Sequence, residues 1–440
     1  MTRLNEQHPL SQTRPDGRPD RLDRRILPGL VLVLAAVAGL RDGGFWHAEA
    51  LAVALIAGVL LAAAAVAAPP DRRSTLVLAS LGLLALWWYV RSVTAGSGTD
   101  FLPLGASIIA FAAAFAAVRP LVGRAREEAA LAMAVLGAVG ALAGFAGLIW
   151  RWFPLAIPAQ GLWRLSSSLT YADAAGLVFA VCLLLALGCA RVPTVVRVVV
   201  CLNFAALLAT QSRGALLAVA CGCFLVPARR YRELAVPLVA GLALGVAAIA
   251  SSPSNDPVPW LAVVVVVGVA LAAVSLLGSL PRWPTTHIQT FVCIAAIGAA
   301  IGAALLVHHE IGVRALAPSD QDRSAEWWSG LHQWFSAPVV GVGPDRLLDL
   351  HASDGSSAHF VHDEYLQIAA DAGLIGLGLL GLVGVSLARA LRRTGPLSSC
   401  AMAAVVCWAV GGAFDFSWHL PVVGLVGGWC AGLAMQRESA

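Results

Sequence analysis

Apolar runs long enough to cross a bilayer, about 20 residues each, recur along almost the whole of this 440-residue chain. Hydrophobic residues make up 59% of the sequence and charged residues only 12%, whereas about a quarter of a soluble domain is charged. Inside a bilayer an isolated apolar segment must satisfy its own backbone hydrogen bonds, so each run is expected to be a helix. The sequence therefore predicts an all-α, polytopic membrane protein.

We expect roughly 12 to 14 transmembrane helices. The candidate spans are 26–40, 49–68, 75–90, 101–118, 128–150, 172–189, 195–209, 214–228, 233–250, 258–279, 287–307, 366–388, 398–413 and 420–436. The first span is short, and only a tight break separates the seventh span from the eighth. The number of spans therefore stays open by one pair of helices. The expected regions are a polar tail (1–25), a helical membrane region (26–307), one long extracytoplasmic loop (308–365), the C-terminal helices (366–436) and a short tail (437–440).

The distribution of arginine predicts the orientation in the membrane. Arginine supplies all 29 basic residues, and cytoplasmic loops are enriched in basic residues. Most of the arginines face the cytoplasm if the N-terminus is placed there, and both termini are then cytoplasmic. Residues 1–25 are Arg-rich and lead into further spans, so no cleaved signal peptide is expected. The expected location is the cytoplasmic (inner) membrane. The net charge of +4 is small for this length and does not indicate a nucleic-acid partner.

The loop 308–365 is the longest polar stretch, and such loops are usually functional or disordered. Its segment SAEWWSGLHQWF (324–335) predicts an amphipathic helix at the membrane interface. Five apolar residues would share one face of it: Trp327, Trp328, Leu331, Trp334 and Phe335. The following APVVGVGPDRLL (337–348) is typical of a glycine turn that leads into a short helix.

Three arginines lie near the outer ends of spans, although basic residues generally favour the cytoplasmic side. Arg213 occupies the tight turn of ATQSRGALLA, Arg164 precedes the span at 172–189, and Arg323 precedes the aromatic helix. Each alone could be an anchor whose charge reaches the interface. As a set they suit a phosphate or pyrophosphate, because guanidinium offers a planar fork and keeps its charge. Arg346, after the glycine turn, is a lesser candidate.

His362 lies just before the point where the span at 366–388 becomes continuous. A single histidine is more often a structural hydrogen-bonding residue, yet its ordinary pKa near 6.5 also makes it the usual proton acceptor at neutral pH. Asp363 and Glu364 follow directly, and His359 lies three residues earlier. This spacing would permit zinc, but further ligands are lacking, so no metal or other cofactor is expected.

The last outward loop, AFDFSWHLPV (413–422), holds Asp415 and His419 between two apolar spans. Ionisable side chains at such positions are costly unless they face a cavity or a partner. Asp415 could orient an imidazole from elsewhere in the chain. Asp173, at the mouth of the span 172–189, is a similar case.

Together, these motifs resemble the O-antigen ligase and O-antigen polymerase superfamily of bacterial membrane glycosyltransferases. The resemblance covers about residues 162–422 and rests on five segments in the family's order: RLSSSLTYADAAG, TQSRGALLA, DRSAEWWSGLHQWFSAPVVGVGPDRL, VHDEYLQIAADAGLIGLGLL and FDFSWHLP. Each motif is degenerate, but their order and the position of the long loop make the combination fairly specific. The sequence departs from the family's pattern at Asp363, where asparagine is commoner, and at Ala172 and Asp173.

The resemblance implies a C-type glycosyltransferase membrane fold and an inverting, metal-independent reaction. Such enzymes transfer glycan from an undecaprenyl pyrophosphate-linked donor to a hydroxyl of a glycan, lipid or protein acceptor at the outer face of the inner membrane. Arg213 and Arg323 match the family's pyrophosphate-binding arginines, and His362 matches its essential loop histidine. The resemblance leaves ligase and polymerase open, since these differ only in the acceptor.

Two alternative functions belong to other classes of membrane protein. A transporter of a small anion such as bicarbonate should carry ionisable groups near the bilayer midplane on broken helices, whereas here the charges gather at outward mouths and in one loop. A non-enzymatic assembly protein would not need the loop arginines. The sequence favours the glycosyltransferase.

Overall fold

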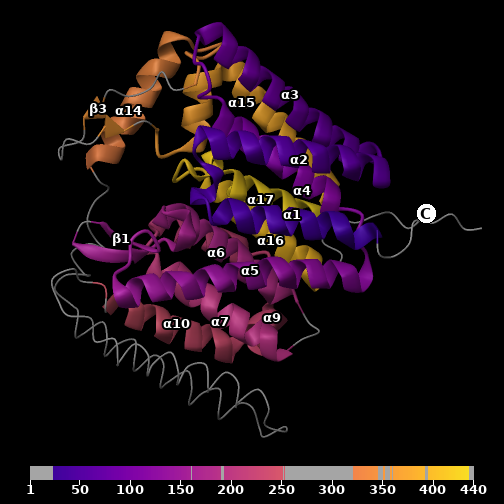
Figure 1. Cartoon of the computed structure of the whole chain (residues 1–440), viewed down its shortest axis with the longest axis vertical. Coiled ribbons are helices and arrows are strands. Elements are labelled where there is room, and N and C mark those ends of the chain that lie inside the picture. Colours follow the sequence, from indigo (N-terminus) through magenta and orange to yellow (C-terminus); the bar gives the residue numbers. More distant parts are fainter. Residues whose placement is uncertain are drawn as a thin grey trace, which may run out of the picture.

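A computed structural model describes residues 23–159, 161–189, 193–250, 252, 321–344, 350–351, 357–358, 360–391 and 395–435. Most of the helices lie side by side with their axes in roughly one direction (Figure 1). The chain is an all-α polytopic membrane protein, as its apolar runs predict. The expected spans at 258–279 and 287–307, along with His359 and Arg346, fall outside the described residues.

The helices follow the predicted spans to within a few residues. In the N-terminal part they are α1 (Asp23–Gly39), α2 (His47–Ala67), α3 (Arg72–Ala95), α4 (Leu102–Val118) and α5 (Gly123–Trp150). The middle part holds α6 (Ala172–Gly188), α7 (Pro193–Ala209), α8 (Arg213–Cys223), the short α9 (Ala228–Glu233) and α10 (Ala235–Ala250). The C-terminal part holds α14 (Gln321–Ser336), α15 (Glu364–Ala390), α16 (Pro396–Gly411) and α17 (Pro421–Ala434).

Among the described helices, α2, α3, α5 and α15 are long and apolar enough to cross a bilayer, and eight shorter ones of 10–17 residues are also apolar. The tight break between the seventh and eighth predicted spans separates two helices, α7 and α8. Three 3₁₀ turns lie between helices: η1 (Asp42–Gly44), η2 (Ser167–Leu169) and η3 (Ser417–His419).

Small residues bring α4 and α17 together. A Cβ atom on Gly428 of α17 would lie 2.1 Å from the carbonyl oxygen of Phe111 in α4, and one on Gly424 would lie 2.3 Å from that of Ser107. Transmembrane helices associate through such close approaches, because lipid offers no hydrophobic drive between them. Nearly every residue of both helices is buried, so this pair lies inside the bundle.

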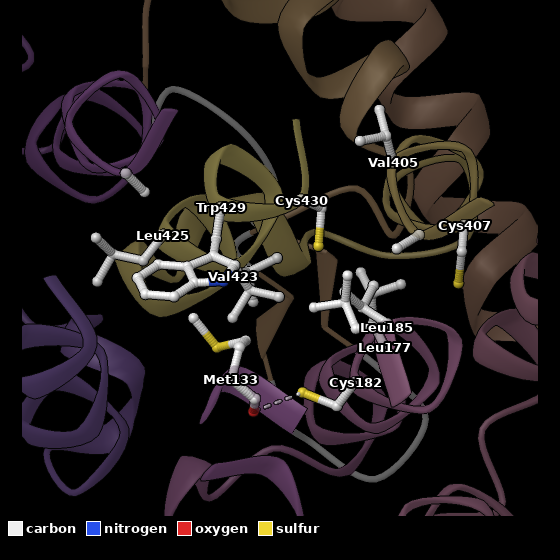
Figure 2. Packing of buried hydrophobic residues seen from close by; sticks show 14 of the residues in the cluster. Met133, Leu177, Cys182, Leu185, Val405, Cys407, Val423, Leu425, Trp429 and Cys430 are labelled. Carbon is white, nitrogen blue, oxygen red and sulfur yellow. Dashed lines mark hydrogen bonds between the residues drawn. The ribbon is translucent and has the colours of Figure 1, made fainter. Parts of the chain in front are cut away.

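The core beside that pair is filled by residues of α5, α6, α16 and α17 (Figure 2). Trp429 is 1% exposed, Met133 is 1% exposed, and Cys182 and Cys430 are fully buried. The thiol of Cys182 donates to the carbonyl oxygen of Met133 at 3.5 Å. The described cysteines are unpaired and most are buried, as expected of small apolar residues in such a core.

Two antiparallel hairpins are the non-helical elements of the described chain. The first pairs β1 (Ala156–Ala159) with β2 (Leu162–Leu165), and the second pairs β3 (Leu350–His351) with β4 (Ser357–Ala358). The first hairpin and α14 lie at the same end of the bundle (Figure 1). Helix α14 belongs to the loop 308–365 that the sequence predicts outside the membrane.

Helix α15 is interrupted at Gly373, whose backbone angles are φ 67° and ψ −166°. The turn that follows α14 replaces the helical hydrogen bonds lost there. Its amides donate to carbonyl oxygens before the break: Val342 to Ala370 (2.8 Å) and Gly343 to Asp371 (2.9 Å). Its carbonyls accept from amides after the break: Pro338 from Leu374 (2.9 Å) and Val339 from Ile375 (3.2 Å).

Helix α3 closes the same junction from the other side. The indole of Trp87 donates to the carbonyl oxygen of Ala372 at 2.9 Å, and Arg91 donates to that of Gly341 at 2.8 Å. A Cβ on Gly341 would lie 2.3 Å from the backbone of Asp371. The turn 337–343 thus joins α14 to α15. Gly341 permits the close approach to α15, and Gly343 permits the approach to Ala95 of α3.

Candidate functional site

A cavity of about 230 Å³ lies where α6 and α8 begin, between α14 and the segment that follows α16. Arg164, Arg213 and Arg323 all line it, and Asp173 and Asp415 also contribute. The three arginines that the sequence singled out separately therefore meet at one place.

Asp173 organises two of these arginines. Its Oδ1 atom accepts from Arg164 Nη2 at 2.8 Å, and its Oδ2 atom lies 3.9 Å from Arg323 Nη2. The Nε atom of Arg164 also donates to the carbonyl oxygen of Thr210 at 2.8 Å. The side chains of Arg164 and Arg323 are 20% and 30% exposed. Both guanidinium groups are held in place while part of each remains accessible from the cavity.

Arg213 is the first residue of α8 and is exposed. Ser212 caps this helix, because its side chain accepts from the amide of Ala215 at 3.3 Å. A Cβ on Gly214 would lie 2.7 Å from that of Phe414, so the start of α8 packs tightly on the segment after α16. A helix N-terminus favours anions, and here it adds to the charge of Arg213.

Asp415 also lines the cavity and is 5% exposed. The hydroxyl of Tyr171 donates to its Oδ1 atom at 2.6 Å, and the hydroxyl of Ser417 donates to Oδ2 at 3.1 Å. Burial and the nearby carboxylate of Asp173 raise the pKa of Asp415 to about 6. Its negative charge is therefore only partly present just below neutral pH.

His362 is paired with a carboxylate. Its Nδ1 atom lies 2.6 Å from Oε2 of Glu326, which is 6% exposed. Burial lowers the pKa of His362, but the hydrogen bond with Glu326 and the charge of Asp415 outweigh it, and the pKa is raised. A carboxylate at Nδ1 favours the neutral tautomer with its proton there, which leaves Nε2 as the acceptor.

The ring of His362 lies edge-on to Phe416 with the ring centroids 5.2 Å apart, directly beside Asp415. His362 itself is absent from the cavity lining. The imidazole and the arginine cavity are therefore neighbours across Phe416.

Helix α14 links these two features. Arg323 and Glu326 are one turn apart, and residues three apart share a helix face. A Cβ on Gly330, one turn further, would lie 2.8 Å from Val361, so the same face packs against the residues before α15. Glu326 was not among the residues predicted from the sequence; the available signal was its position on the helical face that carries Arg323.

The aromatic residues of α14 do not share one environment. Trp327, Trp328 and Phe335 are 41%, 64% and 69% exposed, whereas Trp334 packs against Val361 and Ala370. Trp327 also donates from its indole to the carbonyl oxygen of His362 at 3.4 Å. The predicted single apolar face is therefore divided between solvent or lipid and the protein.

Asp363 caps α15 and is absent from the cavity lining. Its Oδ1 atom accepts from the amides of Tyr365 at 2.9 Å and Leu366 at 3.0 Å. This role suits aspartate and asparagine alike.

We expect Asp363→Ala to lower the free energy of unfolding by about 1 kcal/mol, because two amides lose their acceptor. Asp363→Asn should stay near the wild type, since its side-chain oxygen keeps the cap. Thermal unfolding in detergent measures both. Equal losses in the two variants would contradict a capping role.

A second cavity, of about 460 Å³, is almost wholly apolar and lies between α3, α4, α15 and α16. It reaches Tyr365 and Trp418 at one end and Leu391 at the other. Within the described residues, no three His, Cys, Asp or Glu side chains come together as a metal-binding group.

Residues 198–381 match the family model described as O-antigen ligase. The matched region, less than half of the chain, contains Arg213, Arg323 and His362 but neither Arg164 nor Asp415. No curated protein sequence matches the chain.

Proposed function

We propose that this chain, whose residues 198–381 match the O-antigen ligase family model, belongs to that family and transfers glycan from an undecaprenyl pyrophosphate-linked donor to an acceptor hydroxyl outside the cytoplasmic membrane. One observation carries the proposal. Helix α14 presents Arg323 to a cavity lined by three arginines and presents Glu326 to His362. An anion site and a paired imidazole are thus held side by side on one rigid element.

The arginines would bind the donor's pyrophosphate. Cleavage of the anomeric C–O bond builds negative charge on this leaving group. Arg164 is already bonded to Asp173, and Arg323 to the carbonyl oxygen of Phe414. Preorganised donors of this kind stabilise developing charge without reorganising at the moment of reaction. Guanidinium also keeps its charge at any working pH.

His362 would accept the proton of the attacking hydroxyl at Nε2, while Glu326 holds Nδ1 and stabilises the imidazolium that forms. The hydroxyl oxygen then forms the new bond to the anomeric carbon as the bond to pyrophosphate breaks. Attack from the face opposite the leaving group inverts the anomeric centre.

The apolar cavity between α3, α4, α15 and α16 supports a substrate borne on a lipid. Its lining follows α15 over much of that helix, so it suits a long apolar chain rather than a small ligand. The exposed aromatic residues of α14 would rest at the membrane interface beside it.

The orientation with both termini in the cytoplasm is part of the proposal. Arg72 and Arg73 begin α3, and Arg124 and Arg126 lie in the first turn of α5. The cavity lies where α6 and α8 begin and where α14 and the first hairpin gather (Figure 1). Basic residues at the first set of ends are typical of the cytoplasmic side.

The break in α15 is a feature that favours a transporter, because broken helices often form ion sites. Here the backbone groups on both sides of Gly373 bond to residues 338–343 and to Trp87. The break therefore serves as a joint between protein segments, and the charged groups gather at the cavity instead.

We expect Arg213→Ala and Arg323→Ala each to lower glycan transfer by about 10²–10³-fold, the usual cost of one lost oxyanion donor. The assay compares surface glycan with the lipid-linked pool in cells that lack the native gene. Long lipid-linked chains should accumulate if the enzyme is a ligase, and single repeats if it is a polymerase. Arg41→Ala is the matched control, since Arg41 is exposed and lines no part of the cavity. Normal surface glycan in verified cavity variants would overturn the proposal.

A further inference from the structure

Glu364 and His419 form a buried ion pair outside the cavity. Glu364 is fully buried and His419 is 2% exposed. Their Oε2 and Nδ1 atoms lie 3.1 Å apart. The pair joins the start of α15 to η3, and neither residue has a part in the chemistry proposed above.

Glu364 also holds the segment 412–419 at both of its ends. Its backbone amide donates to the carbonyl oxygen of Gly412 at 2.7 Å, and its Oε1 atom accepts from the amide of Trp418. With the His419 contact, this one residue fastens the segment at its beginning and its end.

Each residue in the middle of this segment touches the candidate site. The carbonyl oxygen of Phe414 accepts from Arg323 Nη1 at 3.3 Å. Asp415 lines the cavity, and Phe416 lies against the imidazole of His362. The position of the segment therefore sets three contacts of the site together.

We propose that Glu364 and His419 are positioning residues that hold segment 412–419 against His362 and Arg323. This inference rests on the proposed function for its kinetic consequence, but not for its structural one. A buried carboxylate is costly unless it is paired and hydrogen-bonded, and Glu364 finds its contacts with Gly412, Trp418 and His419 in this segment.

Other contacts should keep the protein folded when the pair is broken. Trp418 stacks on Trp408 with centroids 4.4 Å apart, and its indole donates to the carbonyl oxygen of Trp408 at 3.3 Å. Phe416 stacks on Tyr171 at 5.0 Å. Loss of the pair would thus loosen the segment rather than release it.

The test uses Glu364→Gln, Glu364→Ala and His419→Gln in the full-length protein. We expect turnover to fall at least about tenfold in Glu364→Ala, because small displacements of reacting groups are costly, and less in Glu364→Gln, which keeps an acceptor for Trp418. The KM for lipid-linked donor should stay within about twofold, since Asp173, outside the segment, still holds Arg164 and lies beside Arg323. Asp71→Asn is the control. Asp71 caps the first turn of α3, and this is the end of α3 away from Arg91 and the turn 337–343.

Two further measurements separate positioning from simple destabilisation. Hydrogen exchange of residues 412–419 should quicken in the Glu364 and His419 variants and not in Asp71→Asn.

The pH–rate profile should also shift. His362 is faced by Glu326 and Arg323 from α14 and by Asp415 from the segment, so losing Asp415 from its place lowers the pKa of His362. Asp415→Asn and Glu364→Ala should both move the acid limb to lower pH, and the double variant no further than Asp415→Asn alone.

Wild-type turnover together with unchanged exchange in Glu364→Ala would overturn the inference. The proposed function fails separately, through normal transfer in a His362 variant. In that case the exchange measurement still decides whether Glu364 holds the segment.

Discussion

His362→Ala should lower glycan transfer by about 10²–10⁴-fold, the usual contribution of a general base, while the protein still inserts and unfolds at nearly the wild-type temperature. The imidazole lies beside the arginine cavity across Phe416, and its Nδ1 atom is held by Glu326 at 2.6 Å. Without it, the attacking hydroxyl loses the proton acceptor that we propose for it. Transfer is measured in proteoliposomes with a lipid-linked glycan donor.

The matched control is His332→Ala, because His332 is exposed on α14 and bonds only within one turn of that helix, to the carbonyl oxygen of Trp328 at 2.9 Å. It should transfer glycan at the wild-type rate. Full activity in a correctly inserted His362→Ala protein would rule out the base assignment.

The same histidine gives a prediction about pH. As a base His362 must be neutral, so activity should be lost as the pH falls through its pKa, which lies above the ordinary value of 6.5. Glu326→Gln removes the charge that helps to raise that pKa. The acid limb of the profile should therefore move to lower pH, and the plateau rate should fall because Nδ1 is held less firmly. An acid limb at the wild-type position would show that Glu326 does not act on His362.

The membrane helices could be predicted from the sequence because each depends on a local property. In lipid, an isolated run of about 20 apolar residues can satisfy its backbone hydrogen bonds only as a helix. Helices α2, α5 and α15 therefore begin and end near the predicted positions. The hairpin of β1 and β2 was missed since its strands are only four residues each and carry no alternating pattern.

The candidate site was predicted as separate residues, and its assembly depends on tertiary packing. Arg164, Arg213 and Arg323 meet because α6, α8 and α14 converge with the segment after α16. Glu326 could not be recognised as a site residue for a related reason: the aromatic residues around it dominate the sequence pattern of α14. Asp363, singled out for its place beside His362, turns out to cap α15. A residue 36 positions away from His362, Glu326, is the one whose carboxylate contacts the imidazole.

Gly373→Ala is expected to cost about 3 kcal/mol or more of stability, because φ 67° with ψ −166° is a region that only glycine enters readily. A Cβ there would also lie 2.3 Å from the carbonyl oxygen of Val339. The turn 337–343 would have to move away from the break, and the four hydrogen bonds that join them would be lost or stretched. Thermal unfolding in detergent measures the cost.

The control for this change lies five residues further along α15. Gly378 has helical geometry, and no atom lies within 4 Å of the position that its Cβ would take, so Gly378→Ala should be neutral or stabilise by about 0.5–1 kcal/mol. Any Gly373→Ala protein that does fold should transfer glycan slowly, because the displaced turn carries α14, and with it Arg323 and Glu326, away from His362. If Gly373→Ala and Gly378→Ala unfold at the same temperature and transfer equally well, the joint between α14 and α15 does not position the site.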